Sequence, residues 1–563
     1  MTPRRAWKIL VRLGLARYAA DVAAAIATVF AVTRGETRFA PPLLALALLI
    51  VGWRGAHAFR RALRTAVGPT GSAVLARVVT AVGLAAVFPP DRVGAVGTFL
   101  VVLALLTEML LAPVARGAVP FTAHLPGIAV RNRPLFRVPW VFVVNTAGLA
   151  LFGVALRAGL SGAVVLGLAA ALMLVTSVAL ADAALRIVAR HRAQRRLPAA
   201  LTRLGPTFLL HFYAPHGSEH QVIMWLPYLD RLGHPYVIVL RNPTTFFEIS
   251  AQTDRPVLLC RYAAELEQLV VSGLRTAFYV NTSPRNDHML RFLDLNQVQL
   301  NHGDSDKAPS YRRVFRAFDK NFVAGQAAVD RFAQHGVKVP DDAFEIVGRP
   351  QVESVHVRPG PPPCGSEGCT VMYAPTWYGY LGDSRYCSLP IGYQLVTALL
   401  QRGCTVVFRP HPWSRRTDEL AREVDRVLRL LRADAAASGR RHLYGPAAES
   451  DRTLADCFNV SDALISDVSS VVGDFLYSEK PLAVIDTQSY VSAEDFLKEF
   501  PVARAAYVLH ADSVPLELGR FLDELLVHDP LAARRREVKE YYLGAFPADH
   551  YADAFLDAAR PYV

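Results

Sequence analysis

The chain has 563 residues, 52% of them hydrophobic, and a positive mean hydropathy of +0.23. The length fits about three to four domains, and the apolar content is high for a wholly soluble protein. The formal charge of +12 suits nucleic acid, anionic lipid or an anionic substrate, so the placement of the basic residues must decide among these partners.

Apolar runs of Ala, Leu, Val and Gly recur before residue 200, and short arginine-bearing loops separate them. Because a membrane-crossing helix needs about 20 mostly apolar residues, we predict a transmembrane domain of about six helices over residues 1–196. One signal peptide does not explain runs that recur. The candidate spans are 15–33, 39–53, 73–90, 93–114, 138–156 and 160–185.

The loops between these runs alternate in charge. Four or five basic residues lie in the N-terminal arm, in the 54–72 loop, in the 115–137 loop and after the last span. This positive-inside pattern predicts a multi-pass protein of the cell membrane, with the N-terminus and the C-terminal part in the cytoplasm. Membrane topology thus explains much of the net positive charge, and we expect no nucleic-acid partner. The alternate loops carry only Arg34 and Arg38, then Arg92, then Arg157.

Two acidic residues fall within the later candidate spans. Glu108 lies in the fourth span and Asp182 near the end of the sixth. Charged groups inside a membrane are normally paired or functional, so we expect Glu108 to pair with a basic residue of a neighbouring span. The spans show no dense polar track, which disfavours transport.

The six cysteines all follow residue 259, and their spacing does not match the paired ligands of a zinc site. Reduced cytosolic thiols are the expected state.

From Thr207 onward, short apolar runs alternate with stretches expected to be helices, such as 220–233 and 263–274, which predicts parallel sheets covered by helices. We expect two Rossmann-like domains, 197–355 and 356–563, that face a cleft, with a Pro/Gly linker at 359–365 and helices from about 514. The expected strands are "TFLLHFY", "PYVIVL", "PVLLC", "TAFYVN", "QVQLN", "NFVAG", "FEIVG", "TVMYAPT", "TVVFRPHP", "DALIS" and "PLAVID".

Ligands of open parallel sheets bind beyond the carboxyl ends of the strands. After "QVQLN" comes His302-Gly303, with Lys307 four residues further on. A histidine in this position is suited to general-base chemistry, and the lysine is suited to an anion. A solvated loop and an Asp-x-Asp metal site at Asp304 and Asp306 are the alternatives.

Three further groups follow strands of the second half. Arg409 precedes the rigid turn Pro410-His411-Pro412, and an arginine fork suits phosphate. Ser466, Asp467, Ser469 and Ser470 surround the expected start of a helix, where backbone N–H groups attract anions, although ordinary N-capping uses the same residue types. The weaker candidates are Thr376 in "YAPTW" and Arg349 in "GRP".

Together these motifs resemble the CDP-glycerol glycerophosphotransferase family of teichoic acid polymerases and primases. The resemblance rests on His-Gly-x-x-x-Lys, Tyr-Ala-Pro-Thr-Trp, His-Pro, Ser-Asp-x-Ser-Ser and Lys-Pro, in this order over roughly residues 207–510. It implies a GT-B fold at the cytoplasmic membrane face. It also implies transfer of a polyol phosphate from a CDP-polyol donor to a lipid-linked acceptor, with release of CMP and without a metal or other cofactor.

The resemblance also implies roles for individual residues. His302 would deprotonate the acceptor hydroxyl, and His411 would stabilise the diphosphate or the leaving nucleotide. Phosphoryl transfer requires positioning and charge stabilisation more than covalent help, so these groups suffice chemically. The remaining substrate-binding candidates are Gly303, Lys307, Arg349, Thr376, Arg409, Ser466, Asp467, Ser469 and Ser470.

The sequence departs from the family at the first motif, where Asn301 replaces a tryptophan and two acids enter the loop. We expect these acids to contact acceptor hydroxyls or to orient His302. A GT-B glycosyltransferase that uses a UDP- or GDP-sugar is one alternative function, and a non-catalytic membrane transporter or scaffold is another.

Overall fold

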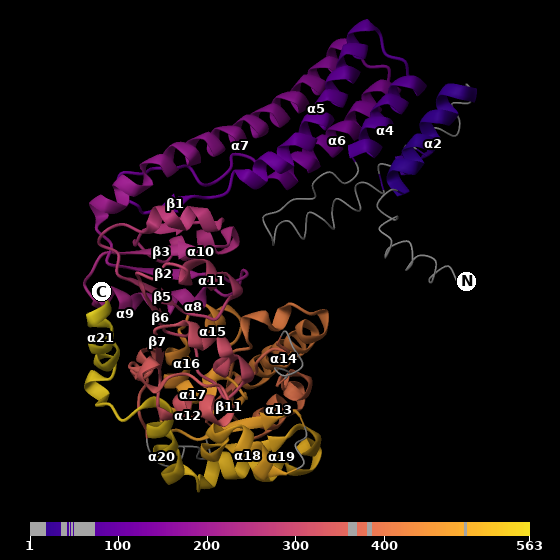
Figure 1. Ribbon diagram of the computed structural model, residues 1–563. Helices are drawn as coiled ribbons and strands as arrows, with labels where there is room; N and C mark the ends of the chain where they lie inside the picture. Colours follow the sequence, from indigo (N-terminus) through magenta and orange to yellow (C-terminus); the bar gives the residue numbers. More distant parts are fainter. Residues whose placement is uncertain are drawn as a thin grey trace. The chain divides into compact units, whose positions relative to one another are not determined.

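The computed structural model describes residues 19–34, 42–43, 45–46, 49, 74–358, 369–379, 386–488 and 492–563. The chain divides into two compact units, Met1–Ala200 and Leu201–Val563 (Figure 1). The N-terminal basic arm, most of the expected 39–53 span, the 54–72 loop and the expected linker at 359–365 lie outside the described residues.

The first unit is helical. Three of its helices are long and apolar enough to cross a membrane, with mean hydropathies of 2.2 for α5, 1.8 for α6 and 2.5 for α7. They contain the expected spans 93–114 and 138–156 and all but the first two residues of 160–185, whereas α4, at the expected span 73–90, has only 14 residues. The elements are α2 (Ala19–Arg34), α4 (Val74–Val87), α5 (Arg92–Gly117), β1 (Thr122–Ala123), α6 (Val138–Arg157) and α7 (Gly162–Leu204).

The long helices of this unit present large apolar side chains outward. Phe99 on α5 is 64% exposed, Leu151 on α6 is 59% exposed and Leu174 on α7 is 64% exposed, whereas Ala104 and Ala169 are buried between helices. Contiguous exposed apolar surface is rare in soluble proteins, and small residues at helix contacts are typical of membrane bundles. Such a distribution is typical of helices that cross a membrane.

A buried ion pair joins α4 to α5. Two guanidinium nitrogens of Arg77 lie 2.9 and 2.7 Å from the two carboxylate oxygens of Glu108, and both side chains are buried. The Asn145 amide on α6 donates to the same carboxylate over 2.8 Å, and it also donates to Thr176 on α7 over 3.0 Å. The expected basic partner of Glu108 is therefore Arg77, and the pair belongs to a network across four helices.

The second unit begins with a parallel sheet in which the strand order is β4-β3-β2-β5-β6-β7-β8. The strands at residues 208–212 ("FLLHF") and 236–240 ("YVIVL") are almost wholly apolar and buried, because helices and loops cover both faces of a parallel sheet. The strands are β2 (Phe208–Phe212), β3 (Tyr236–Leu240), β4 (Val257–Leu259), β5 (Thr276–Tyr279), β6 (Asn296–Gln299), β7 (Lys320–Val323) and β8 (Phe344–Ile346).

The helices around this first sheet are short. The stretch 220–233, expected as one helix, forms α8 and α9 with Pro227 in the first turn of α9, because proline lacks the N–H donor that a continuous helix needs. The expected helix from Ala263 is a 3-10 helix, Ala263–Leu269. The α-helices are α8 (His220–Ile223), α9 (Leu226–Arg231), α10 (Phe246–Ser250), α11 (Asp287–Leu290) and α12 (Gln326–Gln334).

A second parallel sheet follows, with the strand order β10-β9-β11-β12-β13. All expected strands are present, and β13 (Tyr507–His510) is an addition, since its "YVLH" run is too short to stand out. The other strands are β9 (Thr370–Ala374), β10 (Thr405–Phe408), β11 (Ala463–Asp467) and β12 (Leu482–Asp486). The α-helices are α13 (Leu389–Gln401), α14 (Asp418–Ser438), α15 (Pro446–Glu449), α16 (Leu454–Val460), α17 (Ser470–Leu476) and α18 (Ala493–Glu499).

The C-terminal segment is helical, as expected, and it runs from the second sheet back to the first (Figure 1). It comprises α19 (Val514–Asp523), α20 (Ala532–Leu543) and α21 (Asp553–Ala559). Phe555 of α21 packs on Trp225, with ring centroids 5.1 Å apart, and Arg275 beside β5 donates to the Val563 carbonyl over 3.4 Å. The second unit is thus a GT-B-like α/β fold in which the C-terminal segment connects both sheets.

Candidate active site

The residues expected to act on substrate lie beyond the carboxyl ends of parallel strands in both sheets. In the first sheet, β6 ends at Gln299 and leads into His302. In the second sheet, β9 leads to Thr376 and β10 leads to His411. This edge is where open parallel sheets bind their ligands.

His302 is held by the backbone of its own sheet. Its Nδ1 lies 2.7 Å from the carbonyl oxygen of Val280. A carbonyl can only accept, so Nδ1 carries the proton and Nε2 keeps a free lone pair. Burial, together with the neighbouring His220 and Arg349, lowers the pKa of His302 to about 4. The ring is therefore neutral at neutral pH, which is the form that a general base requires.

The turn before His302 explains the unusual Asn301. This residue has a φ of 60°, in the left-handed region that asparagine tolerates better than most residues. Its side-chain oxygen accepts from the His302 N–H over 3.3 Å, and its carbonyl accepts from the Trp225 indole over 2.6 Å. The departure from the family motif is thus compatible with a well-held turn.

The His411 ring accepts a hydrogen bond from the backbone, whereas the His302 ring donates one. Its Nδ1 accepts the backbone N–H of Trp413 over 3.1 Å. An N–H group can only donate, so Nδ1 is unprotonated and the neutral ring carries its proton on Nε2. Burial and the charges of His220, Lys307 and His302 lower the pKa of His411 to about 3. His411 therefore presents an N–H donor, which is suited to a phosphate oxygen.

The His302 loop meets the start of α17. A Cβ added to Gly303 would lie 2.8 Å from both Cβ and Oγ of Ser470, closer than such atoms normally approach. Only glycine fits this contact without a shift of the loop. The structure therefore brings the His-Gly motif of the first sheet against the Ser-Asp-x-Ser-Ser motif of the second.

Arg349 links the His302 loop to α17. Its Nε lies 3.0 Å from Oδ1 of Asp474 on α17, and one terminal nitrogen donates to the His302 carbonyl over 2.9 Å. The side chain is buried, so its donors serve protein groups. We interpret Arg349 as a positioning residue for His302, whereas the sequence suggested a substrate ligand.

The polar residues at the end of β11 divide into two roles. Asp467 is fully buried, and its Oδ2 accepts the backbone N–H groups of Thr376 and Ser388 over 2.7 and 3.2 Å. Burial raises the pKa of Asp467 to about 6, opposed by its hydrogen bonds and by the charge of Lys307. The carboxylate orders the strand-end loops of the second sheet. Ser466 is buried and donates to the Ala374 carbonyl over 2.7 Å, and its hydroxyl lies 3.2 Å from that of Ser469. Ser469 and Ser470 are partly exposed, so these two serines are the ones that a ligand can reach.

Arg409 and Lys307, the two basic residues predicted to bind phosphate, differ in how far protein groups occupy their N–H donors. The Arg409 guanidinium donates to the carbonyls of Ala448 and Arg452, the latter over 3.0 Å, so loop contacts occupy much of it. The Lys307 ammonium lies 5.5 Å from the ring centroid of Tyr386 in the second sheet's half. Burial lowers the pKa of Lys307 to about 8, so most of this lysine is charged at neutral pH.

The two acids beside His302 have a structural partner. Arg331 on α12 forms ion pairs with Asp304 and, over 3.0 Å, with Asp306. Asp306 is 3% exposed and also accepts from the Tyr542 hydroxyl over 2.8 Å. The expectation that these acids contact acceptor hydroxyls is wrong for Asp306, whose two carboxylate oxygens are occupied by Arg331, Tyr542 and the Val502 N–H.

Some residues near the strand ends were not singled out from sequence. The pKa of His220 is lowered by burial and by Arg409, against the charge of Glu219, and this histidine is one of the groups that act on the pKa of His302 and of His411. The Trp377 ring stacks on His411, with centroids 5.9 Å apart, and Trp413 packs edge-on against both. The repeated aromatics after "YAPT" and "RPHP" were the available signal.

Residues 362–514 match the family model described as CDP-Glycerol:Poly(glycerophosphate) glycerophosphotransferase. The match confirms the resemblance inferred from the motifs over these residues and supports the expected enzyme class, a CDP-glycerol glycerophosphotransferase. It includes Thr376, His411 and the Ser-Asp-x-Ser-Ser block, whereas His302 and Lys307 precede it.

No curated protein matches the chain in sequence. Among solved structures, the wall teichoic acid polymerase TagF aligns at 13% identity and a TM-score of 0.40, over 67% of this chain and 94% of that one. HepE from Anabaena, in complex with UDP and glucose, aligns at 13% identity and a TM-score of 0.40, over 63% of this chain and 99% of that one. A putative UDP-N-acetylglucosamine 2-epimerase from Listeria monocytogenes aligns at 10% identity and a TM-score of 0.41, over 63% and 96%.

Proposed function

We propose that this chain, a CDP-glycerol glycerophosphotransferase by its match at residues 362–514, is a membrane-bound enzyme of cell-surface glycopolymer synthesis. It moves a polyol phosphate, of the glycerol or ribitol type, from a CDP-linked donor to a hydroxyl of a lipid-linked saccharide. The observation that carries the proposal is the opposite protonation of two histidines, a free Nε2 on His302 and an Nε2–H on His411.

The chemical step uses these two atoms differently. Nε2 of His302 takes the proton of the acceptor hydroxyl as its oxygen attacks the phosphorus that bears the polyol. The bond from this phosphorus to the bridging oxygen breaks, and CMP leaves with both electrons. The Nε2–H of His411 donates to the diphosphate and stabilises the charge that develops on the leaving group.

The low pKa of His302 is a property of the free site. A base with a pKa near 4 is always available at neutral pH but is weak. A bound diphosphate adds negative charge beside the ring, which favours the protonated form and raises the pKa toward the working range. Donor binding thus strengthens the base at the moment when it is needed.

The remaining substrate contacts are assigned from the charge of the side chains and from their places beyond the strand ends. Lys307, Ser469, Ser470 and the Thr376 side chain supply donors for the diphosphate and the nucleotide. Arg409 contributes the part of its guanidinium that the loop carbonyls do not occupy. Gly303 keeps the acceptor loop and the donor half in contact.

Membrane association is supported by α5, α6 and α7 and by the lipid-type surface of the first unit. The alternation of basic loops places the N-terminus and the catalytic unit in the cytoplasm. Such an anchor would keep the active site close to a lipid-linked acceptor.

Incubation of the full-length protein in membranes with CDP-glycerol, CDP-ribitol, UDP-sugars and GDP-sugars tests the proposal. We expect CMP release from a CDP-polyol and a lipid-linked product whose mass increases by one polyol phosphate. Unchanged turnover in both His302→Ala and His411→Ala would overturn the assignment of the site. Activity with UDP- or GDP-sugars alone would favour a sugar transferase.

Topology has a separate test, because no native cysteine precedes residue 260. Single cysteines placed at Arg92 or Arg157 should react with a membrane-impermeant reagent from outside the cell, and one placed at Arg133 should not. Labelling of all three positions only after lysis would contradict the proposed orientation.

A further inference from the structure

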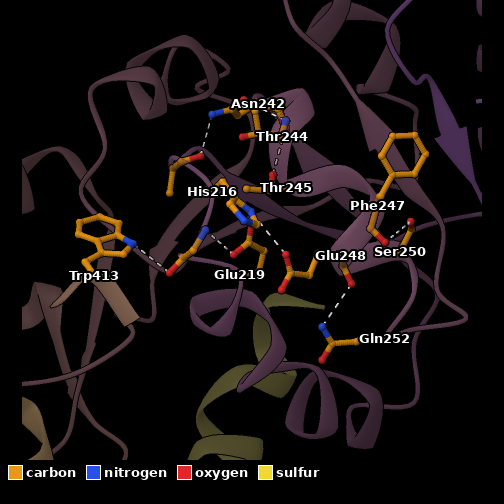
Figure 2. Close-up of polar contacts among 12 residues, drawn as sticks. His216, Glu219, Asn242, Thr244, Thr245, Phe247, Glu248, Ser250, Gln252 and Trp413 are labelled. Atoms are coloured by element: carbon orange, nitrogen blue, oxygen red, sulfur yellow. Dashed lines mark hydrogen bonds and ion pairs between the residues drawn. The ribbon is translucent and has the colours of Figure 1, made fainter. Parts of the chain in front are cut away.

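Three side chains at the carboxyl edge of the first sheet bring ligand-type atoms together (Figure 2). His216 and Glu219 lie in the loop after β2, and Glu248 lies on α10. Nδ1 of His216 is 2.9 Å from Oε1 of Glu219 and 3.5 Å from Oε2 of Glu248. All three ligand atoms lie within 4.8 Å of one another.

These separations match the edges of a small coordination shell. Zinc bonds to imidazole nitrogen and carboxylate oxygen are about 2.0–2.2 Å long, so two ligands of a tetrahedral ion lie roughly 3.4 Å apart. The measured 2.9 and 3.5 Å are close to that value, and a small movement of the exposed Glu248 side chain would complete the fit.

The charge of the cluster is not compensated by a permanent cation. Within the described parts of the chain, the ion-pair partner of both carboxylates is His216, and neither one pairs with a lysine or arginine. The acids of the His302 loop differ, because both form ion pairs with Arg331. Two carboxylates beside one imidazole carry a net negative charge in either form of the ring, and a divalent cation would balance it.

The loop that carries His216 is held in place by contacts around the cluster. The Gly217 N–H donates to Oε2 of Glu219 over 2.7 Å, which orients this carboxylate. Arg416 donates to the His216 carbonyl over 2.7 Å, and the Trp413 indole donates to the Gly217 carbonyl over 3.1 Å. The Glu219 side chain is 4% exposed, so this ligand starts from a fixed position, and the backbone that carries His216 is held as well.

Gly217 is needed for this arrangement. It has a φ of +87°, and a Cβ there would lie 2.9 Å from Nε1 of Trp413. Trp413 also supplies the N–H that fixes His411, so the His216 loop contacts the segment that holds the diphosphate-binding histidine. The cluster therefore lies next to the proposed catalytic residues.

We propose that His216, Glu219 and Glu248 bind one divalent first-row metal ion, with open coordination positions for a phosphate or hydroxyl oxygen. An imidazole with two carboxylates suits zinc or manganese better than calcium or magnesium, and zinc binds such a set more tightly than manganese. Three protein ligands leave at least one position free, as in catalytic zinc sites. The site goes beyond the proposed transfer, which uses His302 and His411 and no metal ion.

Equilibrium dialysis of the full-length protein in detergent against Zn²⁺, with metal quantified by mass spectrometry, tests the inference. We expect one equivalent that is lost, or whose Kd rises about tenfold or more, in His216→Ala and in Glu248→Gln. Both side chains are about half exposed, so the folded state should tolerate these changes. A Co²⁺-loaded sample should show an absorption spectrum that both variants remove.

His234→Ala and Glu267→Gln are matched controls, since both residues are exposed and lie elsewhere on the first sheet. Retained Zn²⁺ in the controls and loss in the site variants would support the site. Absence of Zn²⁺ in the unaltered protein, or equal binding by all variants, would overturn it. Because binding is measured without turnover, this outcome is independent of whether His302 and His411 catalyse CMP release.

Discussion

His302 and His411 are both histidines at strand ends, but the backbone binds Nδ1 of each ring through a different group. A carbonyl fixes the proton of His302 on Nδ1, whereas an N–H group fixes the lone pair of His411 on Nδ1. The substrate-facing nitrogen is consequently an acceptor in the first sheet's loop and a donor in the second's. Backbone polarity, which no residue type encodes alone, therefore separates a base from an electrostatic stabiliser.

A second contrast concerns acidic residues near these loops. Asp304 and Asp306 share an ion pair with Arg331, and burial removes Asp306 from substrate. Glu219 and Glu248 face a histidine and have no such cation among the described residues. The pairing partner thus determines whether an acid near the site is structural or open to a metal.

The largest expected effect comes from replacing each histidine by alanine and by glutamine. His302→Ala and His302→Gln should both lower kcat by about 100-fold or more, because an amide cannot accept the proton. His411→Gln should retain about ten times more activity than His411→Ala, because the amide N–H replaces Nε2–H. CMP release measures all four variants. Equal losses in both glutamine variants would remove the distinction between base and donor.

The next effect concerns the ion-paired acids. Asp306→Ala leaves buried Arg331 with one carboxylate and removes the partner of Tyr542, so the free energy of unfolding should fall by about 3–5 kcal/mol. Denaturation of the detergent-solubilised protein measures this change. Asp341→Ala, at an exposed acid of the same half, is the control and should have little effect. A similar stability for both variants would mean that the Arg331 cluster is not structural.

A smaller effect should follow from the contact between the two motifs. Gly303→Ala places a Cβ against Ser470 and should lower kcat by about tenfold, because the His302 loop must shift. Ser470→Gly removes the opposing atoms, so the double variant should recover part of the loss. If the second substitution deepens the defect by its full individual amount, the contact is not the cause.

The smallest expected effect is on the pH dependence of stability. His211 on β2 is buried, and burial with the charge of Arg241 lowers its pKa to about 3. The unfolded chain then binds a proton below pH 6.5 that the folded chain rejects, so stability should fall as the pH drops from about 6.5 toward 4. His211→Gln should flatten this slope of melting temperature against pH, and His234→Gln should not. An unchanged slope would show that His211 is protonated at its ordinary pKa.

Much of the second unit's architecture follows from the sequence. The runs "YVIVL" and "LAVID" form β3 and β12, and both are fully buried. Such strands can be predicted because a continuous apolar run is visible in the local sequence. The order of strands in space, and β13, depend on long-range pairing. In the first unit, hydropathy located α5, α6 and α7, while the Arg77 partner of Glu108 required the fold.

The sequence predicted where the site residues lie better than it predicted what each of them does. His302, His411 and Ser470 stand at strand or helix ends, as the rule for parallel sheets requires. Arg349 instead binds Asp474, which is 125 residues away in sequence. The spacing His216-x-x-Glu219 was the available sign of a metal ligand pair, but Glu248 joins it only through the pairing of β2 with β3.

The nucleotide released from CDP-glycerol by the full-length protein is the most direct test of the central claim. Attack at the phosphorus that bears the polyol releases CMP, whereas attack at the polyol carbon releases CDP. We predict CMP, formed in equal amount to glycerophosphate on the acceptor and about 100-fold or more slower in His302→Gln. CDP as the product, or CMP formation at the unaltered rate in His302→Gln, would contradict phosphoryl transfer with His302 as the base.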